Sequence, residues 1–177
     1  MKGSPPPLLP ILRSEKQARL LTALLLDPQR AFTLTELSNE VGVSLPTVQR
    51  EVVRAARTGV VSVDRVGRAK QVRADTASPY FEPLARLLLL AFGPLTVVRE
   101  HMGGVPGIDE IIIFGSWAAR YQGQTGEPPH DLDLLVIGNP DRDAVYAAAD
   151  RIEQIIAVPV QGTFRTTEQW HRPGDDP

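Results

Sequence analysis

The chain has 177 residues, 42% of them hydrophobic, which allows one large domain or two small ones. It has no cysteine and only three histidines, which excludes disulfides and thiolate zinc sites. Its uninterrupted apolar runs are far shorter than the roughly 20 residues of a membrane span, so we expect a cytoplasmic protein with no membrane partner. The net charge of −2 is unevenly divided: residues 1–78 hold 12 Lys and Arg against 7 Asp and Glu, whereas residues 79–177 hold 7 against 14. A basic half is suited to a polyphosphate partner, and an acidic half to metal ions or a basic partner.

The N-terminal half begins with a proline-rich stretch, residues 1–13, that predicts a flexible tail. A helix is predicted from Ser14 to Asp27, where leucines recur at helical spacing. A second helix follows a threonine cap, Thr33 or Thr35, and stops at Gly42.

A third helix is predicted to begin at a Ser44 cap, with Pro46 in its first turn and its valines facing inward. Two short helices joined by a tight glycine-containing turn are typical of a helix-turn-helix, whose second helix can enter the major groove of DNA. Alternating valines then surround a basic tip from Arg65 to Lys70. This pattern predicts a hairpin, the wing of a winged helix.

The stretch LTELSNEVGVSLPTVQREVVRAARTGVVSVDRVGRAKQVRAD resembles the winged helix-turn-helix of bacterial transcriptional regulators of the ArsR and MarR kind. The resemblance implies double-stranded DNA as a partner, with some side chains in the groove and others on phosphates. The implied groove-facing residues are Ser44, Thr47, Gln49 and Arg50, with Arg54 near the backbone and Arg65, Arg68 and Lys70 on phosphate. An alternative is that the arginines form an ordinary solvated face, or that the winged helix contacts protein.

The apolar helix from Phe81 to Phe92 is too hydrophobic on all sides for an isolated surface helix. It is expected at a dimer interface, at a domain interface or in a core. Because a single winged helix makes few DNA contacts, specific binding favours a homodimer on a two-fold site.

In the second half, a helix is predicted from Pro94 to the glycines at 103 and 104. The β-branched run Ile111 to Phe114 predicts a central strand buried on both faces. It stops at Gly115 and Ser116, where a short helix begins, and the free N–H groups of such a turn can hold a phosphate.

A later strand, from Asp131 to Ile137, places two carboxylates, Asp131 and Asp133, on one face because side chains alternate along a strand. Two ionised carboxylates at this spacing repel each other unless a cation lies between them. Mg²⁺ is typically bound by one or two carboxylates together with substrate phosphates. A nucleotide therefore fits both the turn and the acidic pair.

The segment IIIFGSWAARYQGQTGEPPHDLDLLVIG resembles the signature of minimal nucleotidyltransferases of the DNA polymerase β superfamily. The resemblance implies an α/β fold with a mixed sheet, triphosphate binding by Gly115 and Ser116, and coordination of Mg²⁺ by Asp131 and Asp133, which would also be the catalytic residues. Active members usually carry a third carboxylate on a later strand. Here the corresponding strand position holds Gln161 or a neighbour, none of them ionisable, and glutamine cannot act as a base. His130 and Glu168 are weaker substitutes.

These patterns together predict an α+β protein of two domains: a winged helix-turn-helix at 14–78, a connecting helix at 79–93, and a nucleotidyltransferase-like α/β domain at 94–170 before a flexible tail at 171–177. The expected function is a DNA-binding transcriptional regulator that binds a nucleoside triphosphate and Mg²⁺. One alternative is an active, antitoxin-like nucleotidyltransferase that modifies a protein, RNA or small molecule and has a toxin protein as partner. Another is a protein-interaction module.

Overall fold

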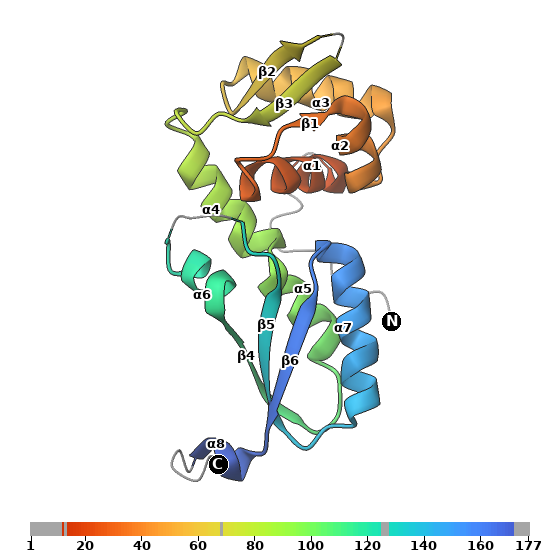
Figure 1. Ribbon diagram of the computed structural model, residues 1–177, viewed down its shortest axis with the longest axis vertical. Coiled ribbons are helices and arrows are strands. Elements are labelled where there is room, and N and C mark those ends of the chain that lie inside the picture. The colour runs from red at the N-terminus through yellow and green to blue at the C-terminus, as the bar shows by residue number, and fades with distance from the viewer. Residues whose placement is uncertain (1–11, 13, 68, 125–127, 172–177) are drawn as a thin grey trace. The chain divides into compact units, whose positions relative to one another are not determined.

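The structure, a computed structural model, describes residues 12, 14–67, 69–124 and 128–171 (Figure 1). The two tails predicted at 1–13 and 171–177 lie outside these residues, except for Leu12 and His171. Contacts along the chain divide it into two compact units, Met1–Gly93 and Pro94–Pro177.

Three helices begin the first unit: α1 (Glu15–Leu26), α2 (Leu34–Val41) and α3 (Leu45–Arg57). Thr33 is the threonine that caps α2, in a reciprocal capping box with Glu36. The Glu36 backbone N–H donates to Thr33 Oγ1 over 3.2 Å, and the Thr33 N–H donates to Glu36 Oε2 over 2.7 Å. Gly42 ends α2 at a φ of +63°, a left-handed conformation that glycine adopts without strain.

A three-stranded antiparallel sheet completes the helix-turn-helix, with strands β1 (Phe32–Thr33), β2 (Val61–Val66) and β3 (Ala69–Ala74) in the order β1-β3-β2. Strands β2 and β3 form the hairpin that directly follows α3 (Figure 1). This succession of elements is the winged helix that the sequence predicts. The two-residue strand β1 is an addition that its short sequence does not reveal.

The core of this unit joins the three helices to the sheet. Leu24, Leu37 and Val48 are fully buried, one from each helix, and Phe32 and Val72 bury the sheet side. Helix α4 (Phe81–Phe92) also packs on α1 and buries Leu88 and Leu89, whereas Leu87 and Leu90 are exposed. The segment predicted as a connector thus supplies one side of a core, and its other side stays apolar and exposed.

By length and composition alone, the 22-residue helical segment Phe81–Met102 is apolar enough to cross a membrane, and 33% of its most apolar window is buried. The core helix of a soluble protein can have the same length and composition, and charged residues within this segment interrupt its apolar runs. Part of the segment, Leu88, belongs to the core of the first unit.

The second unit contains α5 (Pro94–Met102), β4 (Ile108–Phe114), α6 (Gly115–Tyr121), β5 (Leu132–Gly138), α7 (Arg142–Ile156), β6 (Val160–Arg165) and α8 (Thr167–His171). The strand order is β4-β5-β6. Strand β5 pairs antiparallel with β4 and parallel with β6, which makes the sheet mixed, as predicted.

Different helices pack on the two faces of this sheet. Leu132, Leu134 and Val136 of β5 are fully buried on the face where α5 and α7 lie (Figure 1). Phe164 of β6 is on the same face, since its ring meets that of Tyr146 on α7 at a centroid distance of 5.7 Å. The alternate residues of β5 therefore face the other side, where α6 and α8 contact the sheet near its two ends.

The prediction of a central strand at Ile111 to Phe114 was wrong in position. These residues form part of β4, which lies at an edge of the sheet, and β5 is the central strand. The isoleucines at 111, 112 and 113 are half-buried, and Phe114 is 41% exposed. An apolar run indicates a strand but does not reveal its neighbours, because burial of an edge strand depends on how far the covering helices extend.

Candidate nucleic-acid interface and candidate metal centre

Helix α3 is strongly amphipathic, with Val48, Val52 and Ala55 on its buried side. The opposite side consists of exposed residues. These are Gln49, Arg50, Val53, Arg54 and Arg57. Gln49 and Arg50 were predicted to face DNA, and the structure exposes both. Val53 was not predicted, although its helical position opposite the buried valines is visible in the sequence.

The first turn of α3 holds its polar side chains together. The hydroxyls of Ser44 and Thr47 lie 3.1 Å apart, and Arg50 Nη2 donates to Thr47 Oγ1 over 3.1 Å. Ser44 is at the cap position, as predicted, yet no side-chain hydrogen bond to the backbone caps the helix there. Pro46 needs no hydrogen-bond acceptor in this turn because it has no N–H. Three predicted groove residues thus form one polar cluster at the start of the helix.

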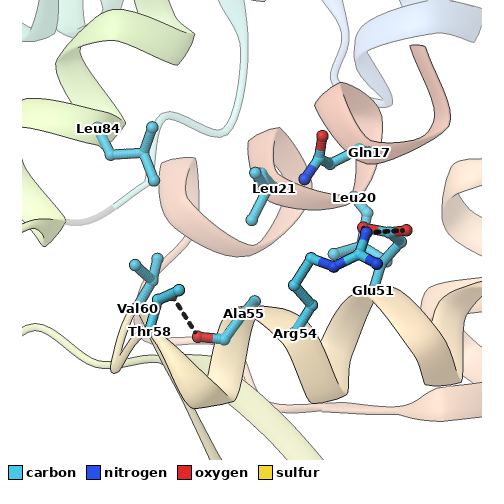
Figure 2. Close-up of a pocket in the computed structure, with 9 residues that line it drawn as sticks. All are labelled: Gln17, Leu20, Leu21, Glu51, Arg54, Ala55, Thr58, Val60 and Leu84. Carbon is cyan, nitrogen blue, oxygen red and sulfur yellow. Dashed lines mark hydrogen bonds and ion pairs between the residues drawn. The ribbon is translucent and has the colours of Figure 1, made fainter. Parts of the chain in front are cut away.

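Arg54 lies one helical turn after Arg50 on α3, and both side chains are exposed. Its guanidinium forms an ion pair with Glu51 at 3.2 Å, and both side chains line a cavity of about 140 Å³ between α1, α3 and Leu84 of α4 (Figure 2). Leu20 and Leu21 of α1 line the opposite wall. Arg54 thus borders this cavity while its side chain stays 47% exposed.

The wing carries two cations opposite each other. Arg65 on β2 and Lys70 on β3 are register partners, and both are exposed. The hairpin turns at Gly67, whose φ of +60° suits glycine. The third predicted wing cation, Arg68, lies outside the described residues. Like charges on directly opposite residues repel, so an anion between or beside them would relieve the repulsion.

The acidic pair lies at the start of the central strand of the second unit. Asp131 immediately precedes β5, and Asp133 is its second residue. Across the sheet, Asp133 is the register partner of Phe114 on β4 and of Gln161 on β6. Both aspartates are half-buried. Desolvation by burial, and then the charge of Asp131, raise the pKa of Asp133 above its usual range.

Gly115 lies directly against Asp133, one member of this pair. It is the first residue of α6, with a φ of +67°, and a Cβ on it would overlap Asp133 Oδ2. Only glycine therefore permits this close approach of the backbone to the carboxylate. Trp117 anchors α6, because its side chain is buried, while Ser116 before it is exposed. Sequence prediction placed Gly115 and Ser116 beside the aspartates, and the structure brings Gly115 into contact with Asp133.

No third carboxylate joins the pair from β6. Gln161 is the residue opposite Asp133, and β6 contains no acidic residue, as the sequence predicted for that strand. Glu168 lies on α8, beyond the far end of β6, and is too distant to substitute. His130 is exposed and adjoins Asp131 in the chain. Among the described residues, no group of three His, Cys, Asp or Glu side chains could hold a metal ion.

No protein-family model and no curated protein matches the chain. Among solved structures, it is similar to reduced HlyU from Vibrio cholerae, at 19% identity over 48% of this chain and 84% of that chain, with a TM-score of 0.39. MepR, a transcription regulator of the Staphylococcus aureus multidrug efflux pump MepA, is 17% identical over 50% of this chain and 64% of that chain, with a TM-score of 0.41. The transcriptional regulator BldR from Sulfolobus solfataricus is 16% identical over 56% and 68%, with a TM-score of 0.43. At such TM-scores the likenesses assign no function, which must come from the geometry of the chain itself.

Proposed function

We propose that this protein is a cytoplasmic, DNA-binding transcriptional regulator whose winged helix binds double-stranded DNA. The observation that carries the proposal is the position of the exposed cations in the first unit. Arg50 and Arg57 lie on the outward face of α3, and Arg65 and Lys70 lie on the hairpin that follows it. A helix presenting Gln and Arg can donate hydrogen bonds to base edges in the major groove, while hairpin cations contact phosphates.

A homodimer belongs to this proposal, because a two-fold DNA site doubles the number of contacts that one protomer makes. The exposed Leu87 and Leu90 of α4 supply apolar surface for such an interface. Light scattering on the purified chain should give twice the monomer mass, and Leu87→Glu should halve it.

The test of DNA binding compares two duplexes, the promoter of the protein's own gene and a random sequence of equal length. Stronger binding to the promoter at moderate salt is the expected result, and Arg50→Ala should reduce it. Equal, weak binding to both duplexes would overturn the proposal. Asp150→Asn, on the exposed side of α7 in the second unit, is a control that should bind promoter like the wild type.

For the second unit, we propose a site for a nucleoside triphosphate and Mg²⁺. The supporting observation is the contact between Gly115 and Asp133, with Asp131 two residues away on the same face. The residues fit a divalent cation, because Asp131 and Asp133 present carboxylate oxygens on the same face. A cation between them would relieve the repulsion that, after burial, raises the pKa of Asp133. Asp131 and Asp133 would hold the ion, and Gly115 and Ser116 would bind phosphate. When bound, Mg²⁺ would neutralise phosphate charge and polarise its oxygens.

Two outcomes separate sensing from catalysis at this site. The regulator reading expects nucleotide to bind with Mg²⁺ without transfer, since Gln161 supplies no base. The alternative is an active, antitoxin-like nucleotidyltransferase acting on a protein, RNA or small molecule, with a toxin protein as partner. Incubation with labelled nucleoside triphosphates and Mg²⁺ distinguishes them. Label that appears on an acceptor, and is lost in Asp131→Asn, would establish the alternative.

A further inference from the structure

Val53 is the apolar member of the outward face of α3. Its side chain is 52% exposed, although three other aliphatic residues of the helix are buried. Valine is a weaker helix former than arginine, glutamine or glutamate, because its β-branched side chain loses rotamer freedom in a helix. On a purely solvated face, a polar residue would stabilise the helix more. This position therefore carries a local cost to stability that contact with a partner would offset.

The surroundings of Val53 restrict what that partner can be. Arg50 lies one turn before it on the same face and Arg57 one turn after it, and Gln49 lies beside Arg50. The partner must therefore be anionic and polar overall, with a small apolar group between polar ones. A lipid surface would require a continuous apolar face, which the two arginines interrupt.

Duplex DNA has such a group in its major groove. Thymine presents its C5-methyl group there, next to hydrogen-bonding base edges, and small aliphatic side chains contact it. The deep, narrow major groove of A-form RNA does not admit a helix. Among polyanions, the surface around Val53 is therefore complementary to B-form DNA that contains thymine.

We propose that Val53 contacts the C5-methyl group of a thymine in bound DNA and thereby makes the winged helix select thymine at that position. This inference rests on the proposed DNA-binding function. Val53 is four residues beyond Gln49, a rise of about 6 Å along the helix axis. Since base pairs are spaced about 3.4 Å apart, the selected thymine should lie one or two steps from the base that Gln49 contacts.

The experiment uses the full chain to select preferred duplexes from a random library. Each thymine of the preferred site is then replaced in turn by deoxyuridine, which removes the methyl group and leaves base pairing intact. One position in each half-site should lose about fourfold in affinity, the effect of one buried methyl group. Val53→Ala should bind the thymine and deoxyuridine duplexes equally.

Ile155→Ala is the matched control, because Ile155 is a β-branched side chain of similar exposure, 55%, on α7 of the second unit. It should retain the full deoxyuridine effect. Thermal unfolding should show Val53→Ala to be folded, since alanine is the better helix former at this exposed position.

Each outcome decides one of the two proposals. A preferred site whose affinity depends on no thymine methyl, or whose dependence survives in Val53→Ala, overturns the role of Val53 and leaves DNA binding standing. Failure to select any preferred duplex overturns the DNA-binding function and the role of Val53 together.

Discussion

Removal of the two opposed wing cations tests whether the hairpin contacts phosphate. In Arg65→Ala combined with Lys70→Ala, two exposed charges are lost from adjacent strands. Each phosphate contact contributes about −0.9 to the slope of log affinity against log salt, so the slope should become shallower by about 1.8. Between about 50 and 200 mM salt, one contact changes affinity about 3.5-fold and two contacts about 12-fold.

The measurement is fluorescence anisotropy with a labelled duplex of random sequence, repeated across a salt series. A random duplex is suitable because phosphate contacts carry no base specificity. The hairpin should not be weakened by the change, since the two residues repel each other in the folded state. The matched control removes two exposed cations of the second unit, Arg99→Ala with Arg151→Ala. If the wing variant and this control have the same slope, the wing does not bind phosphate.

Three further predictions concern stability. Gly115→Ala should destabilise the second unit by about 1–2 kcal/mol in urea unfolding, because alanine is strained at a φ of +67° and its Cβ overlaps Asp133. If Gly115→Ala costs the same free energy in an Asp133→Ala background, backbone strain alone is the cause. Burial, and to a smaller extent the charge of Asp131, raise the pKa of Asp133. The stability that this group contributes is therefore present below its unfolded-state pKa and is lost as the pH rises through its folded-state pKa. Asp133→Asn should remove that decline when unfolding is followed across the acid range without Mg²⁺, and an unchanged pH profile would contradict the assignment. Thr33→Ala should cost about 1 kcal/mol through loss of the α2 cap. Hydrogen bonds from the Thr33 backbone and side chain lower the pKa of Glu36. The Glu36 carboxylate therefore stabilises the fold above its unfolded-state pKa, and this stabilisation is lost as the pH falls through its folded-state pKa. Thr33→Ala should weaken this acid dependence.

The helices were predictable because their signals are local. Ser14, Gly42 and Pro94 mark helix ends through capping and backbone preferences that act within one turn. The valines of α3 gave its buried side for the same reason. The sequence left open whether Thr33 or Thr35 caps α2. Thr33 is the cap because it forms reciprocal hydrogen bonds with Glu36, and this capping box requires a spacing of three residues.

The order of the strands was less predictable. Strand β1 has two residues and exists only because Phe32 pairs with Val72, forty residues later in the chain. The isoleucines of β4 suggested a central strand, yet the sheet places β5 there. Such long-range pairing depends on which strands meet after folding, and no local pattern encodes it.

The site was predicted in parts. Asp131, Asp133 and Gln161 occupy the positions that the sequence indicated, because side-chain alternation fixes the face of a strand. Arg54 was predicted near the DNA backbone; its side chain is exposed and ion-paired with Glu51, and its role in DNA binding stays a prediction.

The edge position of β4 affects how this protein behaves in solution. Among the described residues, no strand pairs with its outer edge, which leaves backbone groups able to pair with another chain. Three features hinder pairing of another strand with the first part of β4. Asp109 and Glu110 carry charge, and the register shifts between Ile108 and Glu110. Thr167 also donates a hydrogen bond to Asp109 over 2.5 Å. The second part, isoleucines followed by Phe114, has no such protection. Refolding at rising protein concentration should therefore lose yield to aggregation through this half of the strand, and Ile112→Lys should restore it.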